Sequence, residues 1–151
     1  MAKQRTATAD DLGAMVALAR AMHEESPRFR PYAFLGYRLR TTLEAVLNMG
    51  PRGCLLVAEH EGQIVGAFVG LATDHFACDM LQACDLGLFI APEHRGGTTA
   101  ARLVRGYLEW ARNIEAEPTI GINTGVAVER TGLLLQSLGA KQSGINWTWG
   151  I

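Results

Sequence analysis

The alternation of apolar and polar positions divides the chain into helical and strand-like stretches. Four stretches repeat apolar residues at three- and four-residue spacing, which is typical of helices with one buried face. Shorter apolar or alternating runs between them are typical of strands. Helices are expected at about 9–24, 35–49, 98–113 and 126–138, and strands at about 5–7, 53–59, 64–73, 80–90, 119–123 and 140–149.

The order of these elements predicts an α/β (α+β) fold, with a mixed central sheet flanked by helices. Written along the chain, the order is β-α-α-β-β-β-α-β-α-β. Residues 60–63 separate two strand-like runs by a short polar turn, which predicts a hairpin. The pattern contains no repeat, low-complexity segment or linker, so residues 1–151 are expected to form a single domain.

Composition and charge limit the classes of function. The 151 residues are 48% hydrophobic and 19% charged, and their formal net charge is −1. A charge balance near neutrality does not favour a nucleic-acid partner, so none is expected. No apolar run reaches the length of a transmembrane helix, and the first residues lack the apolar core of a signal peptide. No membrane association is therefore expected.

Cysteine and histidine usage predicts a cytoplasmic protein without a bound metal. Cys54, Cys78 and Cys84 are an odd number of thiols without metal-ligand spacing, which fits free cysteines in a reducing compartment. The four histidines are scattered and form no cluster with cysteines or carboxylates.

The stretch 86–112 has the most informative pattern in the chain. An apolar run ends at Pro92, a turn centred on Gly96 and Gly97 follows, and helical spacing begins directly after it. The first turn of such a helix has unpaired N–H groups and partial positive charge, which together favour an anion such as phosphate. Glycine tolerates positive φ and lets a ligand approach the backbone closely. The pattern therefore predicts a phosphate site.

Three arginines accompany this turn. Arg95 lies in it, and Arg102 and Arg105 follow in the first helical turns. Cations at a helix N-terminus oppose the helix dipole, so a bound anion would explain them. The alternative is a solvated surface on which Arg105 pairs with Glu109.

The turn does not match the common nucleotide-binding motifs. No lysine follows the glycines as a P-loop requires, and the dinucleotide pattern Gly-x-Gly-x-x-Gly is absent. The turn also follows a meander late in the chain, not the first strand of a parallel sheet. A diphosphate that is held but not cleaved needs no metal, and coenzyme A carries such a group.

The segment Arg95-Gly96-Gly97-Thr98-Thr99-Ala100 resembles the acyl-CoA-binding motif of the GNAT superfamily of N-acetyltransferases, Arg/Gln-x-x-Gly-x-Gly/Ala. The first and last positions match the motif. Thr98 replaces the middle glycine, which crowds the loop but leaves the backbone N–H groups available. The order of elements from residue 5 onward and the Leu138-Gly139 pair also resemble this family.

The resemblance implies a binding mode for acetyl-CoA. The sheet splays apart after the strand that ends at Ile90, and the pantetheine arm pairs with the backbone of that strand. The diphosphate lies on the amides of the glycine turn. Asn123 stands at a common position for a pantetheine contact, or alternatively is a turn residue bonded to its own backbone. The implied acetyl-CoA-binding residues are Leu88, Phe89, Ile90, Arg95, Gly96, Gly97, Thr98, Thr99, Ala100 and Asn123.

The resemblance also implies the reaction: direct attack of a primary amine, from a small molecule or a peptide, on acetyl-CoA in a ternary complex. A backbone N–H near 88–90 would stabilise the oxyanion. Relatives often use a carboxylate on this strand as the base, and Asp85 is the carboxylate there. A solvent-facing Asp85, or one at a helix terminus, is the alternative.

Leu135 stands where many relatives have a tyrosine that protonates the leaving thiolate. Water, Ser137 or Cys84 would then supply the proton. Alternatively, the chain is a non-catalytic acyl-CoA-binding sensor or scaffold with the same fold. A nucleotide-phosphate binder on another α/β fold is the third hypothesis.

The acceptor region has mixed charge. Its acidic and aromatic candidates, which would suit a cationic amine, are Glu24, Glu25, Tyr32 and Asp79. Its basic residues are Arg28, Arg30, Arg38 and Arg40, so a mixed solvated surface is the favoured interpretation. Trp147 and Trp149 fit the cleft, a homodimer edge or, most commonly for tryptophan, the core.

Overall fold

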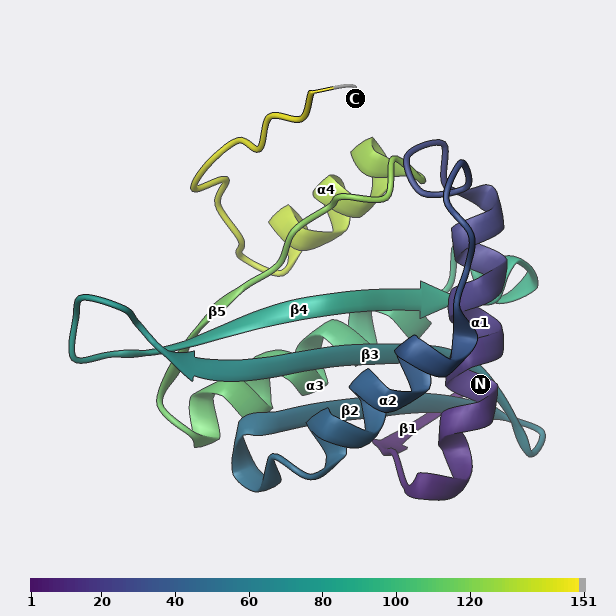
Figure 1. Cartoon of the computed structure of the whole chain (residues 1–151), viewed down its shortest axis with the longest axis horizontal. Coiled ribbons are helices and arrows are strands. Elements are labelled where there is room, and N and C mark those ends of the chain that lie inside the picture. Colours follow the sequence, from purple (N-terminus) through teal and green to yellow (C-terminus); the bar gives the residue numbers. More distant parts are fainter. Residues whose placement is uncertain (150–151) are drawn as a thin grey trace.

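The structure is a computed structural model that describes residues 1–149. One five-stranded sheet with the order β1-β2-β3-β4-β5 forms its centre (Figure 1). The first four strands pair antiparallel, and β5 pairs parallel to β4. The strands are β1 (Lys3–Thr6), β2 (Gly53–His60), β3 (Gln63–Asp74), β4 (Leu81–Ile90) and β5 (Ala116–Thr119). The predicted α/β fold class and the hairpin at 60–63 are confirmed.

Helices cover both faces of the sheet. They are α1 (Leu12–Glu25), α2 (Gly36–Leu47), α3 (Thr99–Asn113) and α4 (Val128–Ser137), with short 3-10 turns at 9–11, 50–52 and 92–94. The helices α1 and α2 lie on one face and α3 on the other (Figure 1). Since strand side chains alternate between faces, Val69 packs into the core under α1 and α2, whereas its neighbour Phe68 stacks on Tyr107 of α3 at 4.5 Å between ring centroids.

A buried carboxylate fixes the start of the first helix. Asp11 accepts a hydrogen bond from the Thr8 N–H at 2.8 Å and pairs with Arg5 of β1 at 2.7 Å. Arg5 also pairs with Glu59 of β2 at 2.9 Å. The hydrogen bond from Arg5 is the main cause that lowers the pKa of Asp11 to about 2. This network ties the start of α1 to β1 and β2 at one edge of the sheet.

A β-bulge interrupts β4 and was not anticipated from the sequence. Val69 of β3 lies opposite Gly87, but its neighbour Gly70 lies opposite Asp85, so Leu86 is the extra residue. Before the bulge, the odd-numbered side chain of Ala83 packs on the α3 side of the sheet. After the bulge, the odd-numbered side chain of Phe89 packs on the side of α1 and α2. The bulge therefore places Asp85 and Gly87 on opposite faces of the sheet.

The sheet splays where β5 leaves β4. Their pairing runs from Leu81 opposite Ala116 to Cys84 opposite Thr119. The Tyr107 hydroxyl donates to the Thr119 carbonyl at 2.9 Å, and the Thr119 hydroxyl donates to the Ala83 carbonyl at 3.1 Å. Beyond this point, the described residues give β4 a partner on the β3 side alone. The predicted splaying of the sheet is thus observed.

Two strand predictions were wrong. The strand expected at 119–123 lies instead at Ala116–Thr119. Pro118, which was expected to mark a loop, lies within this strand, since an edge strand tolerates proline. The expected strand 140–149 does not form: this tail is irregular, since the preceding β5 offers an edge of four residues and Gly144 weakens strand formation. Trp147 and Trp149 are 77% and 83% exposed, so the core interpretation of this pair was also wrong.

Within residues 1–149, no helix combines the length and the apolar character needed to cross a bilayer.

Candidate functional site: a cleft beside the open edge of the sheet

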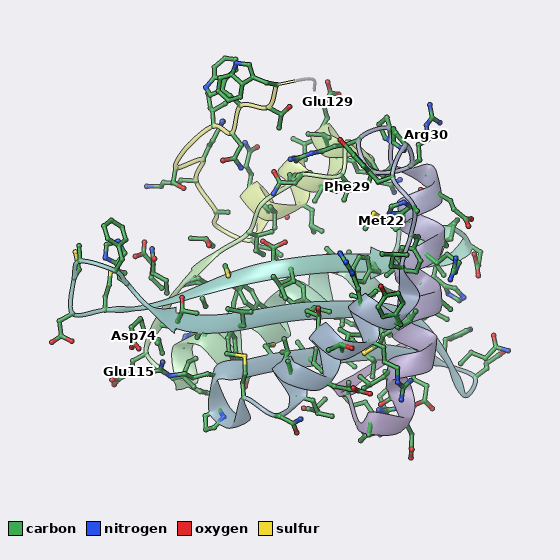
Figure 2. The ribbon with its side chains drawn as sticks, in the orientation of Figure 1. Met22, Phe29, Arg30, Asp74, Glu115 and Glu129 are labelled. Carbon is green, nitrogen blue, oxygen red and sulfur yellow. The ribbon has the colours of Figure 1, made fainter. Side chains whose placement is uncertain are left out.

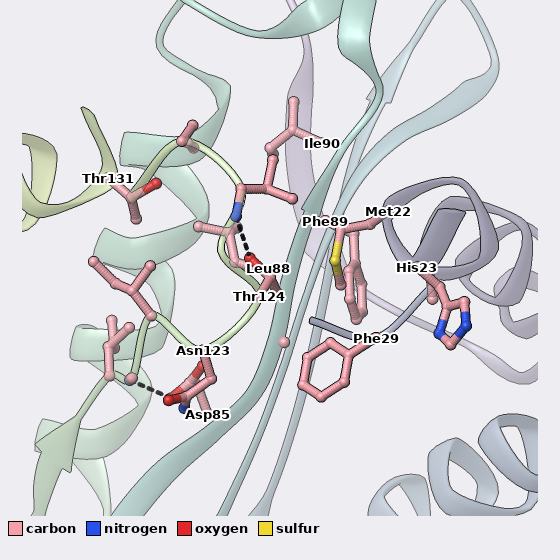
Figure 3. Close-up of a pocket in the computed structure, with 18 of the residues that line it drawn as sticks. Met22, His23, Phe29, Asp85, Leu88, Phe89, Ile90, Asn123, Thr124 and Thr131 are labelled. Atoms are coloured by element: carbon pink, nitrogen blue, oxygen red, sulfur yellow. Dashed lines mark hydrogen bonds between the residues drawn. The ribbon is translucent and has the colours of Figure 1, made fainter. Parts of the chain in front are cut away.

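A cavity of about 890 Å³ occupies the gap left by the splayed sheet. Its lining comes mainly from the second half of β4, the turn 94–97, the segment 120–134 and the end of α1 with its following loop. Leu39 of α2, Ala100 of α3 and residues 146–148 of the tail complete it. Figure 3 shows this arrangement, with Leu88 and Ile90 on one side of β4 and Phe89, Met22 and Phe29 on the other. The predicted site residues on β4 and in the glycine turn thus share one cavity.

The backbone of β4 offers an unpaired edge to this cavity. The Ala91 N–H donates to Val65 of β3 at 2.9 Å, so alternation turns the backbone of Phe89 toward β3 and that of Leu88 and Ile90 toward the gap. The Ile90 carbonyl accepts a hydrogen bond from Arg95 Nε at 3.0 Å. Leu88 and Ile90 are therefore the residues whose backbone an added, extended ligand would meet, whereas Phe89 contributes its ring to the opposite wall.

The glycine turn presents backbone N–H groups to the cavity. Gly96 has φ +87°, a left-handed conformation that favours glycine. Among the described residues, no hydrogen-bond acceptor is recorded for the N–H groups of Gly96, Gly97 and Thr98. A Cβ atom on Gly97 would meet nothing within 4 Å, so the space beside it is open. The turn fits a diphosphate in charge and in room.

The two threonines of the motif have a different environment. Thr98 precedes α3, and neither it nor Thr99 is among the residues that line the cavity. Thr99 is buried and its methyl group packs against Gly66 of β3, whereas Ala100 lines the cavity. Any contact of Thr98 or Thr99 with a diphosphate would therefore come from the backbone.

The arginines near the turn have separate roles. Arg95 lines the cavity and pairs with Glu25 of α1 at 2.8 Å. Arg102 instead donates to the Ala2 carbonyl at 2.8 Å and contacts the Met1 sulfur, and it does not line the cavity. Arg105 is exposed and also lies outside the cavity lining. Of the three, Arg95 is the arginine that lines the cavity beside the glycine turn.

A fourth arginine, Arg130 of α4, was missed from the sequence. Its guanidinium lies over the turn, at 2.6 Å from the position that a Cβ on Gly96 would take. It also lines the cavity. No local pattern could have found it, because 34 positions of sequence separate two groups that only the fold brings together.

Asp85 lies at the point where β4 and β5 diverge. Its Oδ1 accepts a hydrogen bond from the Gly121 N–H at 2.8 Å, and the residue lines the cavity (Figure 3). Burial raises the pKa of this carboxyl, and the Gly121 N–H offsets part of that rise. A half-buried carboxylate with a raised pKa suits a general base.

Asn123 lines the cavity from the segment after β5. Its Oδ1 accepts a hydrogen bond from Asn146 Nδ2 at 3.3 Å, and its carbonyl accepts one from Arg28 at 3.0 Å. The turn hydrogen bond of this segment comes from Thr124, whose hydroxyl accepts from the Val126 N–H at 3.2 Å. Asn123 is thus a lining residue whose side chain is bonded to the tail.

The comparison with protein families identifies this architecture. Residues 18–132 match the model of the acetyltransferase (GNAT) family. The chain belongs to the GNAT family. Among curated proteins, no sequence matches it at a significant level.

Solved structures share the GNAT fold over the whole chain. A transcriptional regulator from Bacillus halodurans C-125 has a TM-score of 0.79 at 18% identity, with 100% of both chains covered. An aminoglycoside acetyltransferase from an uncultured soil metagenomic sample has a TM-score of 0.72 at 18% identity, covering 100% of this chain and 99% of that one. Glucosamine-6-phosphate N-acetyltransferase from Arabidopsis thaliana has a TM-score of 0.76 at 11% identity, covering 99% and 98%. These likenesses show the shared fold.

The side chains considered as proton donors lie outside the cleft of this GNAT domain. Leu135 packs against the core beneath α4, and Ser137 donates its hydroxyl to the Leu134 carbonyl at 2.7 Å. Neither these residues nor Cys84 line the cavity, and burial raises the pKa of the Cys84 thiol. Thr131 is the residue of α4 whose hydroxyl lies in the lining.

The α1 side of the cleft, where the acceptor is expected, is mostly apolar and has little acidic character. Met22, His23, Phe29, Phe34 and Leu39 line it. Figure 2 shows Phe29 on the cleft side of the loop after α1 and Arg30 extending outward. The remaining acidic, aromatic and basic candidates, apart from Arg28, do not line the cavity: they are Glu24, Glu25, Tyr32, Asp79, Arg30, Arg38 and Arg40.

Among residues 1–149, no group of three or more His, Cys, Asp or Glu side chains is arranged to hold a metal ion.

Proposed function

We propose that this chain is an acetyl-CoA-dependent N-acetyltransferase that moves the acetyl group to a primary amine in a ternary complex. One observation carries the proposal: a single cavity joins the open edge of β4 at Leu88 and Ile90 to the unpaired N–H groups of the glycine turn. An extended pantetheine arm ending in a diphosphate needs both features, side by side and in this order. Membership of the GNAT family supports the same donor.

Different residues of the chain would bind different parts of acetyl-CoA. Gly96, Gly97 and Thr98 would hold the diphosphate through their N–H groups, and Arg95 and Arg130 would balance its charge. The backbone of Leu88 would pair with the pantetheine arm as an added strand. These contacts bind and orient the thioester and need no metal.

For the chemical step, the acceptor must lose a proton before it attacks. Asp85, directly or through a water molecule, would take this proton from the ammonium group. The amine nitrogen then forms a bond with the acetyl carbon, and the carbon–sulfur bond breaks with its electron pair going to sulfur. A backbone N–H near 88–90 would stabilise the charge on oxygen. The nitrogen loses its second proton to water as the amide forms, the sulfur takes one proton from water, and Asp85 returns its proton to solvent. The products are therefore the amide, free coenzyme A and one net released proton.

A non-catalytic acyl-CoA-binding module is the second candidate. It is favoured by Leu135, which packs against the core and has no proton to donate, and by the absence of Ser137 and Cys84 from the described cavity lining. Without a side-chain acid, thiolate protonation falls to water. A coenzyme A thiolate tolerates this, so the loss lowers the rate and leaves the reaction possible.

Two measurements test the proposal. Thermal unfolding with acetyl-CoA, CoA, ATP or NAD should show a higher Tm with the two CoA species alone, since a ligand of the native state stabilises it by mass action. Thiol release with a panel of amines then distinguishes the enzyme from the binding module. A response to ATP without one to CoA would contradict the proposal. Binding without release from any amine would favour the module.

The cysteines support a cytoplasmic location as part of the proposal. Cys54, Cys78 and Cys84 are free thiols. Burial raises the pKa of Cys54 to about 12, so this thiol is unreactive, whereas Cys78 is exposed. A reducing compartment suits an exposed free thiol.

A further inference from the structure

The charges that line the cavity are unsuited to a polycationic acceptor. Arg28, Arg95 and Arg130 are its arginines, of which Arg95 and Arg130 belong to the proposed diphosphate site, so Arg28 is the arginine left beside the acceptor. Asp85 is the single carboxylate among the described residues that line the cavity. Glu25, the nearest acidic residue on α1, is already paired with Arg95. A polyamine or aminoglycoside has several ammonium groups, each of which gains from a carboxylate and is repelled by an arginine. The cavity offers such a molecule one favourable partner.

The wall of the acceptor side fits an apolar body. Met22, Phe29 and Phe34 face this part of the cavity from α1 and its loop. The Phe89 ring lies over Gly87, in the space where any side chain at that position would stand. An aromatic or branched aliphatic group would bury its surface here at about 25 cal/mol per Å².

Arg28 is held at the mouth of the cavity with donors to spare. It donates to the Asn123 carbonyl at 3.0 Å, and its guanidinium carbon lies 5.0 Å from the centre of the Phe29 ring. The same loop is anchored by Ser26, which is fully buried and donates to the Thr124 carbonyl at 2.5 Å. The ion pairs formed within the described chain do not include Arg28. A guanidinium has five N–H donors, so a carboxylate could bind to the remaining ones.

Arg28 and Asp85 both bind the backbone of the short segment 121–123. Arg28 binds the carbonyl of Asn123, and Asp85 binds the N–H of Gly121. Residues two positions apart in a chain are separated by at most about 7 Å. A positive and a negative side chain therefore both attach to the segment 121–123 on one wall of the cavity, which complements a small molecule with opposite charges.

We propose that the acceptor is a small zwitterionic amine, an α-amino acid with an aromatic or branched apolar side chain. Arg28 binds its carboxylate, the wall of Met22, Phe29 and Phe34 contacts its side chain, and its amino group points toward Asp85 and the thioester. This acceptor class rests on the proposed acetyl transfer. The amine nitrogen gains the acetyl group, and the coenzyme leaves as the thiol, with the proton balance given above.

Matched pairs of amines test this class with the full chain. Thiol release from acetyl-CoA is measured with phenylalanine and phenylethylamine, with leucine and isoamylamine, and with spermidine and kanamycin as polycations. The members of the first two pairs differ only by the carboxylate. Loss of a charged hydrogen bond costs about tenfold to a hundredfold, so kcat/KM should favour each amino acid over its partner by at least about tenfold. Spermidine and kanamycin should be poorer than either amino acid.

Substitution of Arg28 links the preference to this side chain. In Arg28→Gln the ratio of kcat/KM for phenylalanine over phenylethylamine should fall at least about tenfold, through KM, and Arg28→Lys should restore part of it. Arg30→Gln is the matched control, because Arg30 is exposed in the same loop and outside the cavity lining. It should keep the full ratio.

The outcomes separate the two proposals. Thiol release with no preference for the amino acids, or faster release with a polycation, overturns the acceptor class and leaves acetyl transfer standing. An equal loss for both members of a pair in Arg28→Gln, at an unchanged ratio, also overturns it, because that is the result of a purely structural role. Silence with every amine, despite stabilisation by acetyl-CoA, overturns the transfer reaction itself.

Discussion

The two halves of β4 differ in the number of strands with which they pair. Leu81–Cys84 is paired on both sides, with β3 and β5, and faces α3 through fully buried Ala83. The second half, 85–90, is paired with β3 alone and borders a cavity of about 890 Å³. The bulge at Leu86 separates them. Unpaired backbone groups inside a protein are costly unless a partner satisfies them, which fits the proposal that the second half binds an extended ligand.

Two carboxylates show the same contrast. Asp11 lies beside β1, where Arg5 lowers its pKa to about 2. In the splayed part, Asp85 receives one backbone N–H, and burial raises its pKa. The first carboxylate stabilises the fold when ionised, whereas the second is less stable when ionised and is therefore available to accept a proton. Stability and reactivity are thus assigned to different parts of the sheet.

The largest effect should come from filling the open space of the turn. In Gly97→Val, a side chain would occupy the room beside the unpaired N–H groups without meeting the protein, since a Cβ there has nothing within 4 Å. Acetyl-CoA affinity should fall more than about a hundredfold, equivalent to about 2.7 kcal/mol, while the Tm of the free protein changes little. Thermal shift over an acetyl-CoA titration measures both.

Gly144→Val is the control for this substitution. Gly144 also has no neighbour within 4 Å of its Cβ position, but it lies in the tail and does not line the cavity. It should bind acetyl-CoA normally. Normal binding by Gly97→Val would show that the phosphate assignment is wrong.

Removal of the proposed base should have the next largest effect. Asp85→Asn keeps an oxygen for the Gly121 N–H but cannot take a proton, so kcat/KM should fall about a hundredfold, as for a lost general base. Asp79→Asn is the control, because Asp79 is exposed and outside the cavity. Equal activities of the two variants would exclude Asp85 as the base.

The pH dependence sharpens this test. Because the folded state raises the pKa of Asp85, the native state holds this proton more tightly than the unfolded state does. The contribution of Asp85 to the free energy of unfolding is therefore present at low pH. It is lost as the pH rises from about 3.9, the usual pKa of aspartate, through the raised pKa of Asp85 in the folded protein. Asp85→Asn should therefore lose the acid limb of the kcat/KM profile and gain stability relative to the natural chain as the pH rises.

The paired part of the sheet was predictable from the sequence because its signals are local. The turn at 60–63 and the apolar spacing over 98–113 each act within a few residues, and the structure has β2, β3 and α3 at these places. The glycine turn was also found, because a strand, two glycines and a helix form one continuous pattern. The resemblance to a family then supplied the order of elements around it.

The splayed part was harder to predict because tertiary contacts determine it. The bulge at Leu86 depends on the register with β3, and Arg130 reaches Gly96 only through the path of the chain after β5. Arg102 fitted a phosphate site by position, but in the fold it binds the Ala2 carbonyl. The tail alternates weakly and has no long edge to pair with, so its pattern did not produce a strand.

A third substitution tests the stabilising carboxylate. Asp11→Asn removes the charge that Arg5 binds, and the lowering of the Asp11 pKa from 3.8 to about 2 corresponds to about 2 kcal/mol of unfolding free energy at neutral pH. This contribution is complete above about pH 4 and is lost as the pH falls toward the folded value, so the two proteins should converge in acid. Urea unfolding at several pH values measures it. Asp10→Asn, a neighbouring exposed carboxylate, should have little effect, and an equal loss in both variants would contradict the assignment.

The smallest predicted effect lies at the point where β4 and β5 part. Tyr107 is fully buried, and its hydroxyl donates to the carbonyl of Thr119, the last residue of β5. Tyr107→Phe keeps the stacking on Phe68 but leaves this carbonyl without its donor, so unfolding free energy should fall by about 1 kcal/mol. Tyr37→Phe, at a position that is 67% exposed, should cost nothing measurable by urea unfolding. Because this hydroxyl holds the paired end of β5, Tyr107→Phe should also speed hydrogen exchange in β5 relative to β2. If Tyr107→Phe changed hydrogen exchange equally in β5 and β2, the hydrogen bonds between β4 and β5 alone would hold the end of β5.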